Sequence, residues 1–292
     1  MGHLNNDRES FRKIKLTIAL IHNNDKARLN KIRPNIASLS KKLTPNIETT
    51  IDEIGYQPKI RPVSLKMGIF RDIMYWKLDR EWARYRKVRN PFLPFHFAKF
   101  VIKSIIKYSH PRRLRGWLKS CAIEMILSNK HLSAIDNSLY GNTDYLLVFE
   151  DDAIFKKDSV IKLHNLLLQL KNTTKSPLYM DLGGGFDLDS LGLGELETRR
   201  SAEFRHYSRP ATNTTCCYLL NKKQLMIFNH FLTKNPSLRY LGSDWLLNKL
   251  FIMQLAENIT TDCRHAHPPF FEHGSASGKF ESGIRQSFYS AW

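Results

Sequence analysis

Three consecutive carboxylates, Glu150-Asp151-Asp152, directly follow the apolar run Tyr145-Leu-Leu-Val-Phe149. The run is typical of a buried strand, and in an open α/β sheet ligands bind beyond the carboxyl ends of the strands. Alternation along the strand sends Glu150 and Asp152 to one side and Asp151 to the other. Converging carboxylates repel each other unless a cation lies between them, and Mg²⁺ or Mn²⁺ prefers such oxygen ligands. The alternative is a solvated acidic turn without function.

The surrounding pattern predicts an α/β fold with a parallel sheet. A β-branched run at 15–21, a helix with Leu29, Ile32, Ile36 and Leu39 on one face, and a strand at 47–51 form a βαβ unit. Residues 186–209 are polar and predict a loop. We also expect the following elements: strands at 145–149, 178–182 and 215–220, and helices at about 68–89, 95–108, 118–127, 158–171, 222–233 and 243–256.

Positive charge is concentrated in one part of the chain. The 292 residues carry 45 Lys+Arg and 27 Asp+Glu, a net charge of +18. Residues 66–119 hold 15 basic and 3 acidic residues, hence +12 of that charge, together with 11 of the 33 aromatic residues. This segment predicts a basic-aromatic helical insertion, at about 60–115, in a single domain spanning 14–292. Residues 1–13 are polar and predict a flexible terminus.

Three functions compete for this basic-aromatic segment. Lys and Arg with aromatic residues suit an anionic membrane surface, where each basic residue contributes about 1 kcal/mol. The same residues would also suit a plain structural role, or phosphate contact and base stacking with nucleic acid. Nucleic acid is the least favoured of the three. Arg112, Arg113 and Arg115 could instead hold an acidic acceptor.

Composition excludes several other classes. With 42% hydrophobic residues the chain has ample material for a core, so disorder of the whole chain is excluded. The 4 cysteines are too few for a disulfide scaffold and lack the spacing of a zinc site. The run Leu16–Ile21 is too short for a membrane span of ~20 residues or a signal-peptide core of ~7–15. We therefore expect a reduced, cytoplasmic protein, peripheral on the cytosolic face of a membrane if the basic segment binds one.

Several ordered segments resemble glycosyltransferase family 25, the lipopolysaccharide and collagen galactosyltransferases of the GT-A (Rossmann-like) fold. The match is closest at Leu146-Leu-Val-Phe-Glu-Asp-Asp-Ala153. The opening strand differs from the family's Asn-Leu-Asp signature, since it ends in Ile21-His-Asn-Asn-Asp25. Further segments are similar: Leu16 to Arg28, Ile51-Asp52, Ser120 to Leu127, Thr212 to Asn221, and Pro268 to Arg285.

The resemblance implies a GT-A domain with a mixed, mainly parallel central sheet and a metal-dependent site. Glu150 and Asp152 would hold Mn²⁺ (or Mg²⁺) and, through it, the diphosphate of a nucleotide-sugar, UDP-linked by expectation. Asp151 would contact ribose or a neighbouring backbone group, and His273 would complete the metal shell unless it is an ordinary polar loop residue. The remaining donor contacts that we expect are Lys279, Arg285 and His22.

Inverting transfer also needs a base for the acceptor hydroxyl, and the resemblance favours Asp244 in Leu241-Gly-Ser-Asp-Trp245. The alternative is that Ser243 or Asp244 caps the helix that starts there. The function that follows is transfer of a hexose, galactose or glucose, from a nucleotide-sugar to a hydroxyl of a glycan or lipid-linked acceptor. The alternative from another class is a non-catalytic basic binding module, for a membrane surface or nucleic acid, on a degenerate transferase fold.

Overall fold

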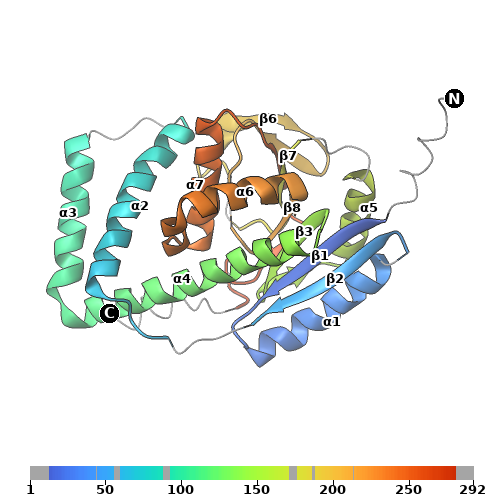
Figure 1. The fold of residues 1–292 in the computed structure, drawn as a ribbon, viewed down its shortest axis with the longest axis horizontal. Coiled ribbons are helices and arrows are strands. Elements are labelled where there is room, and N and C mark those ends of the chain that lie inside the picture. Colours follow the sequence, from blue (N-terminus) through green and yellow to red (C-terminus); the bar gives the residue numbers. More distant parts are fainter. Residues whose placement is uncertain are drawn as a thin grey trace.

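The computed structural model describes residues 13–43, 45–55, 60–87, 93–170, 176–185, 188–212 and 214–280. Figure 1 shows the strands and helices that these residues form. The strands are β1 (Ile14–Ile21), β2 (Ile47–Ile54), β3 (Tyr145–Glu150), β4 (Ala153–Phe155), β5 (Leu178–Asp181), β6 (Glu197–Arg200), β7 (Phe204–Tyr207), β8 (Cys217–Asn221), β9 (Asp262–Ala266) and β10 (Phe271–His273). The α-helices are α1 (Lys26–Leu43), α2 (Leu65–Tyr85), α3 (Leu93–Ser109), α4 (Pro111–Tyr140), α5 (Ser159–Leu170), α6 (Lys222–Lys234) and α7 (Ser243–Ala256). Two short 3₁₀ helices are η2 (Gly194–Leu196) and η3 (Pro236–Tyr240).

One mixed sheet forms the centre of the described molecule. Its strand order is β2-β1-β3-β8-β5-β9-β7-β6. The pairings make β7 and β8 antiparallel to the other strands, which all share one direction. A second, two-stranded sheet pairs β4 with β10. The predicted α/β class with a mixed, mainly parallel sheet is confirmed, and this arrangement is consistent with a GT-A-like fold.

The first βαβ unit, β1-α1-β2, is stabilised by a buried strand, a capped helix start and an apolar helix face. β1 is apolar almost throughout because its side chains are buried on both faces of the sheet. The Oδ1 atom of Asp25 accepts hydrogen bonds from the backbone N–H of Ala27 (2.9 Å) and Arg28 (3.2 Å), which satisfies donors at the start of α1. The periodic apolar residues of α1 are all buried, so one stripe of the helix covers the sheet.

Helices cover both faces of the sheet and create two apolar layers. On one face α1 and α5 pack over Leu147, and on the other α2, α4, α6 and α7 pack over Leu146. These two leucines are adjacent on β3 and are both fully buried, because successive strand residues point to opposite faces. The described molecule therefore has three layers, helices, sheet and helices, with one apolar core on each face of the sheet.

Two expectations about the elements were wrong. The polar segment at 186–209 contains the hairpin of β6 and β7, which extends the sheet. β6 is an edge strand with exposed arginines, so its composition resembles that of a loop. The helix expected at 118–127 is part of the much longer α4, whose buried face continues to Ala134 and Ile135.

The basic-aromatic segment forms α2, α3 and the first part of α4, as helices were expected there. α3 lies at the far end of the molecule from α1, with α2 between α3 and α7 (Figure 1). Among the described helices, none combines the length and the apolar character needed to cross a bilayer. Residues 1–12 of the expected flexible terminus lie outside the described residues, and the domain limits stay a prediction.

Candidate active site

The carboxyl ends of β1 and β3 lie side by side and place the three acidic residues at one edge of the sheet. In the parallel pairing Ile21 of β1 is level with Glu150 of β3. The backbone N–H of Glu150 also donates to the carbonyl of Cys216 (2.9 Å), in the segment just before β8. The site therefore receives residues from three stretches that are far apart in the sequence.

Glu150 is held by two side chains from other elements. Its Oε1 atom lies 3.1 Å from Nε2 of His131 on α4 and accepts a hydrogen bond from the hydroxyl of Thr215 (2.5 Å). The other ring nitrogen of His131 lies 2.9 Å from the hydroxyl of Tyr218. The hydroxyls of Thr215 and Ser243 lie 2.9 Å apart, which links Glu150 to the first turn of α7.

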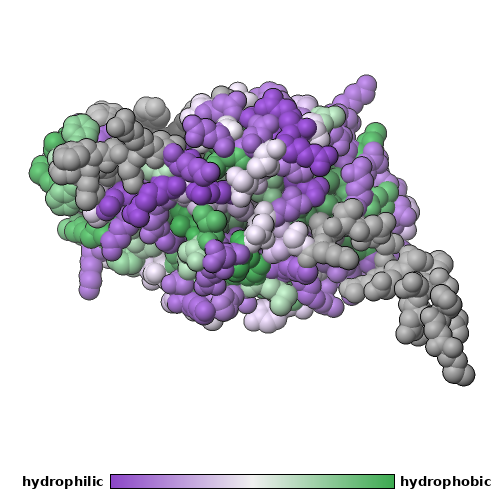
Figure 2. Space-filling view, turned by 90° about the horizontal axis from the view of Figure 1, so that it is seen from above, coloured by the Kyte–Doolittle hydropathy of each residue, from purple (hydrophilic) through white to green (hydrophobic). Residues whose placement is uncertain are grey.

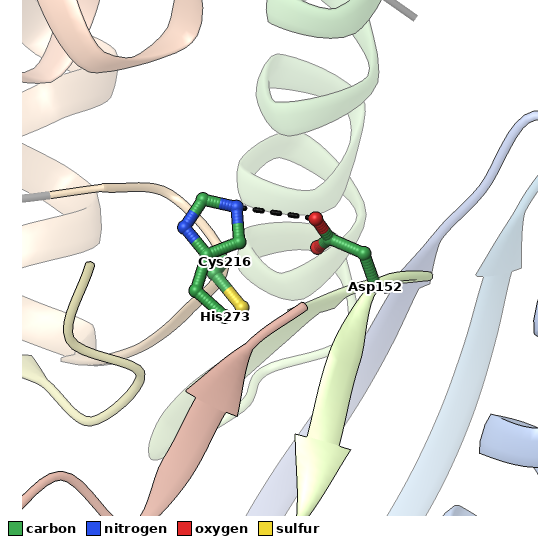
Figure 3. Close-up of side chains that lie close together, drawn as sticks. All are labelled: Asp152, Cys216 and His273. Atoms are coloured by element: carbon green, nitrogen blue, oxygen red, sulfur yellow. Dashed lines mark ion pairs between the residues drawn. The ribbon is translucent and has the colours of Figure 1, made fainter. Parts of the chain in front are cut away.

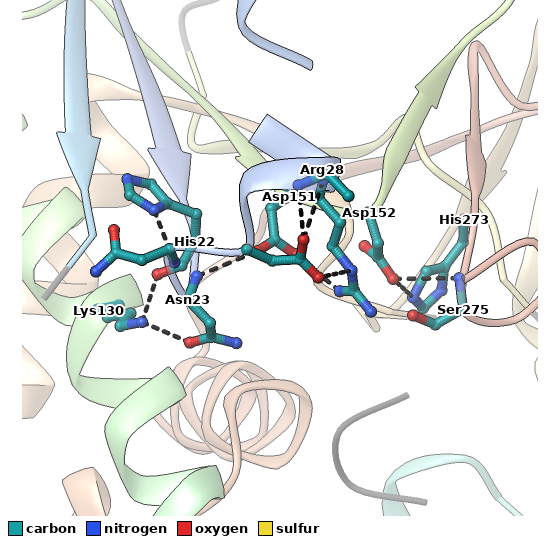
Figure 4. Close-up of polar contacts among 11 residues, drawn as sticks. His22, Asn23, Arg28, Lys130, Asp151, Asp152, His273 and Ser275 are labelled. Atoms are coloured by element: carbon teal, nitrogen blue, oxygen red, sulfur yellow. Dashed lines mark hydrogen bonds and ion pairs between the residues drawn. The ribbon is translucent and has the colours of Figure 1, made fainter. Parts of the chain in front are cut away.

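Asp151 holds the turn between β1 and α1. Its carboxylate accepts hydrogen bonds from the backbone N–H of Asn23 (3.1 Å) and from Nη1 of Arg28 (3.0 Å). Burial raises the pKa of Asp151 above its usual range, although both of these donors oppose that shift. Figure 4 shows this row of contacts, from Lys130 and His22 to Asp152 and His273.

Asp152 meets His273 because β4 pairs with β10, where His273 is opposite Ala153. Oδ2 of Asp152 lies 3.1 Å from Nε2 of His273 and accepts a hydrogen bond from the backbone N–H of Ser275 (3.2 Å). The thiol of Cys216 completes a cluster whose potential ligand atoms lie within 4.8 Å of one another (Figure 3). Burial would raise the pKa of Asp152, but the hydrogen bond and charge of His273 lower it below its usual range.

Asp244 is the second residue of α7 and does not cap it. The N-cap is Gly242, and no side chain makes a capping hydrogen bond at this helix start. Burial, and next the charge of Glu150, raise the pKa of Asp244 to about 7, while His273 opposes this shift. The alternative of a capping residue is therefore wrong, and Asp244 lies within electrostatic reach of both Glu150 and His273.

Three buried polar atoms of the candidate site have no hydrogen-bond partner within the described part of the chain. They are Oδ1 of Asp152, Oδ1 of Asp244 and Nδ1 of His273. An unsatisfied buried polar atom costs about 1–3 kcal/mol, so several of them in one place call for an explanation. Unpaired oxygen and nitrogen acceptors are what a cation or a polar substrate would satisfy.

Each of the other expected donor contacts has a partner elsewhere or lies outside the described residues. Nζ of Lys279 is exposed and pairs with Glu272 (2.8 Å). His22 is buried at the end of β1, where Nδ1 accepts a hydrogen bond from the backbone N–H of Asn24 (3.2 Å). A Cβ at position 55 would lie 1.9 Å from the His22 ring, so the ring fits only because residue 55 is glycine. Arg285 lies outside the described residues.

Sequence reasoning missed four residues that the structure brings to the site: Lys130, His131, Thr215 and Cys216. The Lys130 side chain is fully buried and donates to the His22 carbonyl (2.6 Å) and to Oδ1 of Asn23 (2.7 Å). Burial lowers the pKa of Lys130, while the charges of Asp151 and Glu150 oppose that change. Lys130 and His131 lie beyond the helix expected at 118–127, so the expected elements did not place them in the core.

Comparison with known proteins adds little to this geometry. No family model matches the sequence, and no curated protein matches it. The fold is similar to the crystal structure of a glycosyltransferase involved in the glycosylation of the major capsid of PBCV-1. That similarity covers 94% of this chain and 98% of the other, at 8% sequence identity and a TM-score of 0.39. A likeness this low carries no argument for the family, and membership of family 25 stays a prediction.

Proposed function

We propose that this protein is a metal-dependent, inverting glycosyltransferase. It would move a hexose, galactose or glucose, from a nucleotide-sugar, UDP-linked by expectation, to a hydroxyl of a glycan or lipid-linked acceptor. The observation that supports this best is the group of unpartnered buried atoms of Asp152, Asp244 and His273. They lie beyond the carboxyl end of β3, where ligands bind in α/β sheets.

The residues present fit a divalent cation. Asp152 offers a free carboxylate oxygen, His273 a free ring nitrogen, and Glu150 a second carboxylate close enough to affect the pKa of His273. Carboxylate oxygen and imidazole nitrogen are ligands that Mn²⁺ accepts. When bound, the metal would neutralise the negative charge that develops on the leaving diphosphate.

Asp244 is suited to hold the proton of an acceptor hydroxyl. A carboxylate with a pKa of about 7 is half ionised near neutral pH, where a general base works best. Its free Oδ1 atom supplies a buried acceptor. The hydrogen bonds from Glu150 through Thr215 to Ser243 fix the helix turn that carries Asp244, so the base and the acidic residues keep their relative positions.

Binding and catalysis are separated by comparing Asp152→Asn with Asp244→Asn. Mn²⁺ with UDP-galactose or UDP-glucose should raise the melting temperature of the wild type and of Asp244→Asn, but not of Asp152→Asn. Release of UDP, with water or a glycan as acceptor, should be lost in both variants, by about 10²–10⁴-fold for loss of the base. Differential scanning fluorimetry and a UDP-release assay measure the two effects.

The control is Asp158→Asn, which removes an exposed carboxylate that pairs with Lys162 on the surface of α5. This variant should behave as the wild type in both assays. If Mn²⁺ and the nucleotide-sugars leave the melting temperature of the wild type unchanged, the enzyme proposal is wrong. A basic binding module without catalysis would give that result.

A further inference from the structure

Helix α3 is apolar on two faces. Its inner face packs against α2 and α4, with Phe97 still half exposed there. Phe97 and Phe100 each lie 5.7 Å from the ring of Trp76 on α2. Nζ of Lys107 pairs with Asp72 of α2 (2.8 Å). Tyr108 donates to the same carboxylate (2.7 Å) and packs edge-on against Trp117 of α4, with ring centroids 5.5 Å apart. These contacts attach α3 to the rest of the molecule and fix which side of it faces outward.

The outer face of α3 consists of Phe95, Ile102, Ile105 and Ile106. Their exposed fractions are 68%, 57%, 61% and 51%. At 3.6 residues per turn they fall within about 100° of the helix circumference, so they form one continuous stripe. Isolated exposed apolar residues are common, but a stripe of four large ones along one helix marks an interaction surface.

Basic residues border this stripe. Lys99 and Lys103 are exposed and follow Phe95 and Ile102 around the helix on one side. The whole of α3 contains three lysines and no aspartate or glutamate. In Figure 2 the end of the molecule that holds α3 shows hydrophobic surface beside hydrophilic surface. The combination of bulky apolar side chains and positive charge is typical of a helix that lies flat in a membrane interface.

We propose that the outer face of α3 binds the surface of a bilayer that contains anionic phospholipid. Phe95, Ile102, Ile105 and Ile106 would enter the boundary between headgroups and acyl chains, and Lys99 and Lys103 would contact lipid phosphates. A second copy of this chain fits less well, because a two-fold contact through this stripe would bring the lysines of the two copies together. This inference goes beyond the proposed transfer reaction and does not depend on it.

Vesicle co-sedimentation of the full-length protein tests the proposal. The wild type should pellet with phosphatidylglycerol–phosphatidylcholine vesicles, and less with pure phosphatidylcholine or at high salt. The triple variant Ile102→Ser/Ile105→Ser/Ile106→Ser should lower the partition coefficient more than about tenfold, because it removes most of the apolar stripe. Lys99→Gln/Lys103→Gln should lower it by about 30-fold on the anionic vesicles, because each lysine contributes about 1 kcal/mol there.

The matched control is Ile161→Ser/Met226→Ser, which changes two apolar residues of similar exposure, 60% and 57%, on α5 and α6. It should bind vesicles like the wild type, and all variants should keep the wild-type unfolding midpoint and response to Mn²⁺. Absence of vesicle binding by the wild type would overturn the proposal. Unchanged vesicle binding by the triple variant would also overturn it. So would a wild-type protein that forms a dimer and does not bind vesicles, if the triple variant is a monomer.

Discussion

Asp244, the proposed base, lowers the stability of the folded state when its buried carboxyl group is ionised. Its carboxyl group is buried close to Glu150, and both effects disfavour ionisation, which raises its pKa from 3.8 to about 7. In the unfolded state the carboxyl group loses its proton near pH 3.8, and in the folded state it does so near pH 7. Between these two pH values the folded state retains a proton that the unfolded state has released, so stability falls as pH rises through this window.

Replacing Asp244 by asparagine should therefore stabilise the metal-free protein at neutral and alkaline pH. The two proteins should differ little at pH 4, and the difference should grow up to about pH 7 and then stay constant. One pKa unit corresponds to about 1.4 kcal/mol, so the gain above pH 7 is a few kcal/mol. Urea unfolding at pH 4, 5.5 and 8 measures it.

Asp158→Asn is again the matched control, because Lys162 lowers the pKa of that exposed carboxyl rather than raising it. This control should show no gain at pH 8. Equal stability of Asp244→Asn and the wild type across the whole pH range would contradict the burial of a charged carboxylate at this position.

The carboxylates of the site were predictable, whereas the groups that hold them were not. The apolar run that forms the strand and the acidic residues Glu150-Asp151-Asp152 at its end are neighbours in the sequence. Local residue types therefore suffice to predict both. The partners Thr215 and Asn23 are 65 and 128 residues away from the carboxylates that they contact. Only strand order and register bring such residues together, and neither can be read from residue spacing.

At the scale of elements, α2 is attached to the segment that leads into α7 through a buried arginine and a tyrosine. The guanidinium of Arg71 donates to the carbonyl of Tyr240 (2.5 Å) and to Glu124 of α4 (2.6 Å). The hydroxyl of Tyr75 accepts a hydrogen bond from the backbone N–H of Gly242 (2.7 Å), the N-cap of α7. The first helix of the basic-aromatic segment therefore positions the turn that carries Asp244.

Substituting Arg71 by methionine should destabilise the protein by about 1.5–3 kcal/mol, because Glu124 and the Tyr240 carbonyl lose a buried, charged hydrogen-bond donor. Arg33→Met is a suitable control, since Arg33 and Glu53 form an exposed pair at 2.6 Å. An exposed pair contributes about 0–1 kcal/mol. Chemical denaturation of both variants measures the two effects, and equal losses would show that the Arg71 pair does not connect α2, α4 and α7 energetically.

Prediction of the elements succeeded where a strong apolar period meets burial and failed at the sheet edge. α1 and β3 were predictable because each places its apolar residues against the core. The β6–β7 hairpin was missed because β6 has the sequence Glu-Thr-Arg-Arg, which is partly buried at its first position and exposed at the other three. Arg200 pairs locally with Glu197 (2.8 Å), and the polar sequence of β6 lacks the alternation that normally marks a strand.

For the whole molecule, the excess of basic and aromatic residues in 66–119 divides into two roles. Arg71, Trp82 and Lys107 are used in packing and ion pairs within the fold. The exposed lysines of α3 and its outer isoleucines have no comparable role in packing. The structural and the membrane-binding interpretations of this segment are therefore compatible, since they apply to different residues: the packing contacts of α2 and of the inner face of α3, and the outer face of α3.

The two apolar layers share a single sheet, and we expect them to unfold together. Leu146 and Leu147 are matched probes, because both are fully buried and adjacent on β3 but belong to different layers. Leu146→Ala and Leu147→Ala should each cost about 2–5 kcal/mol. Each should shift one cooperative transition, seen at the same urea concentration by circular dichroism and by tryptophan fluorescence. Two transitions, of which each variant moves only one, would mean that the layers fold as separate units and would contradict a single domain around β3.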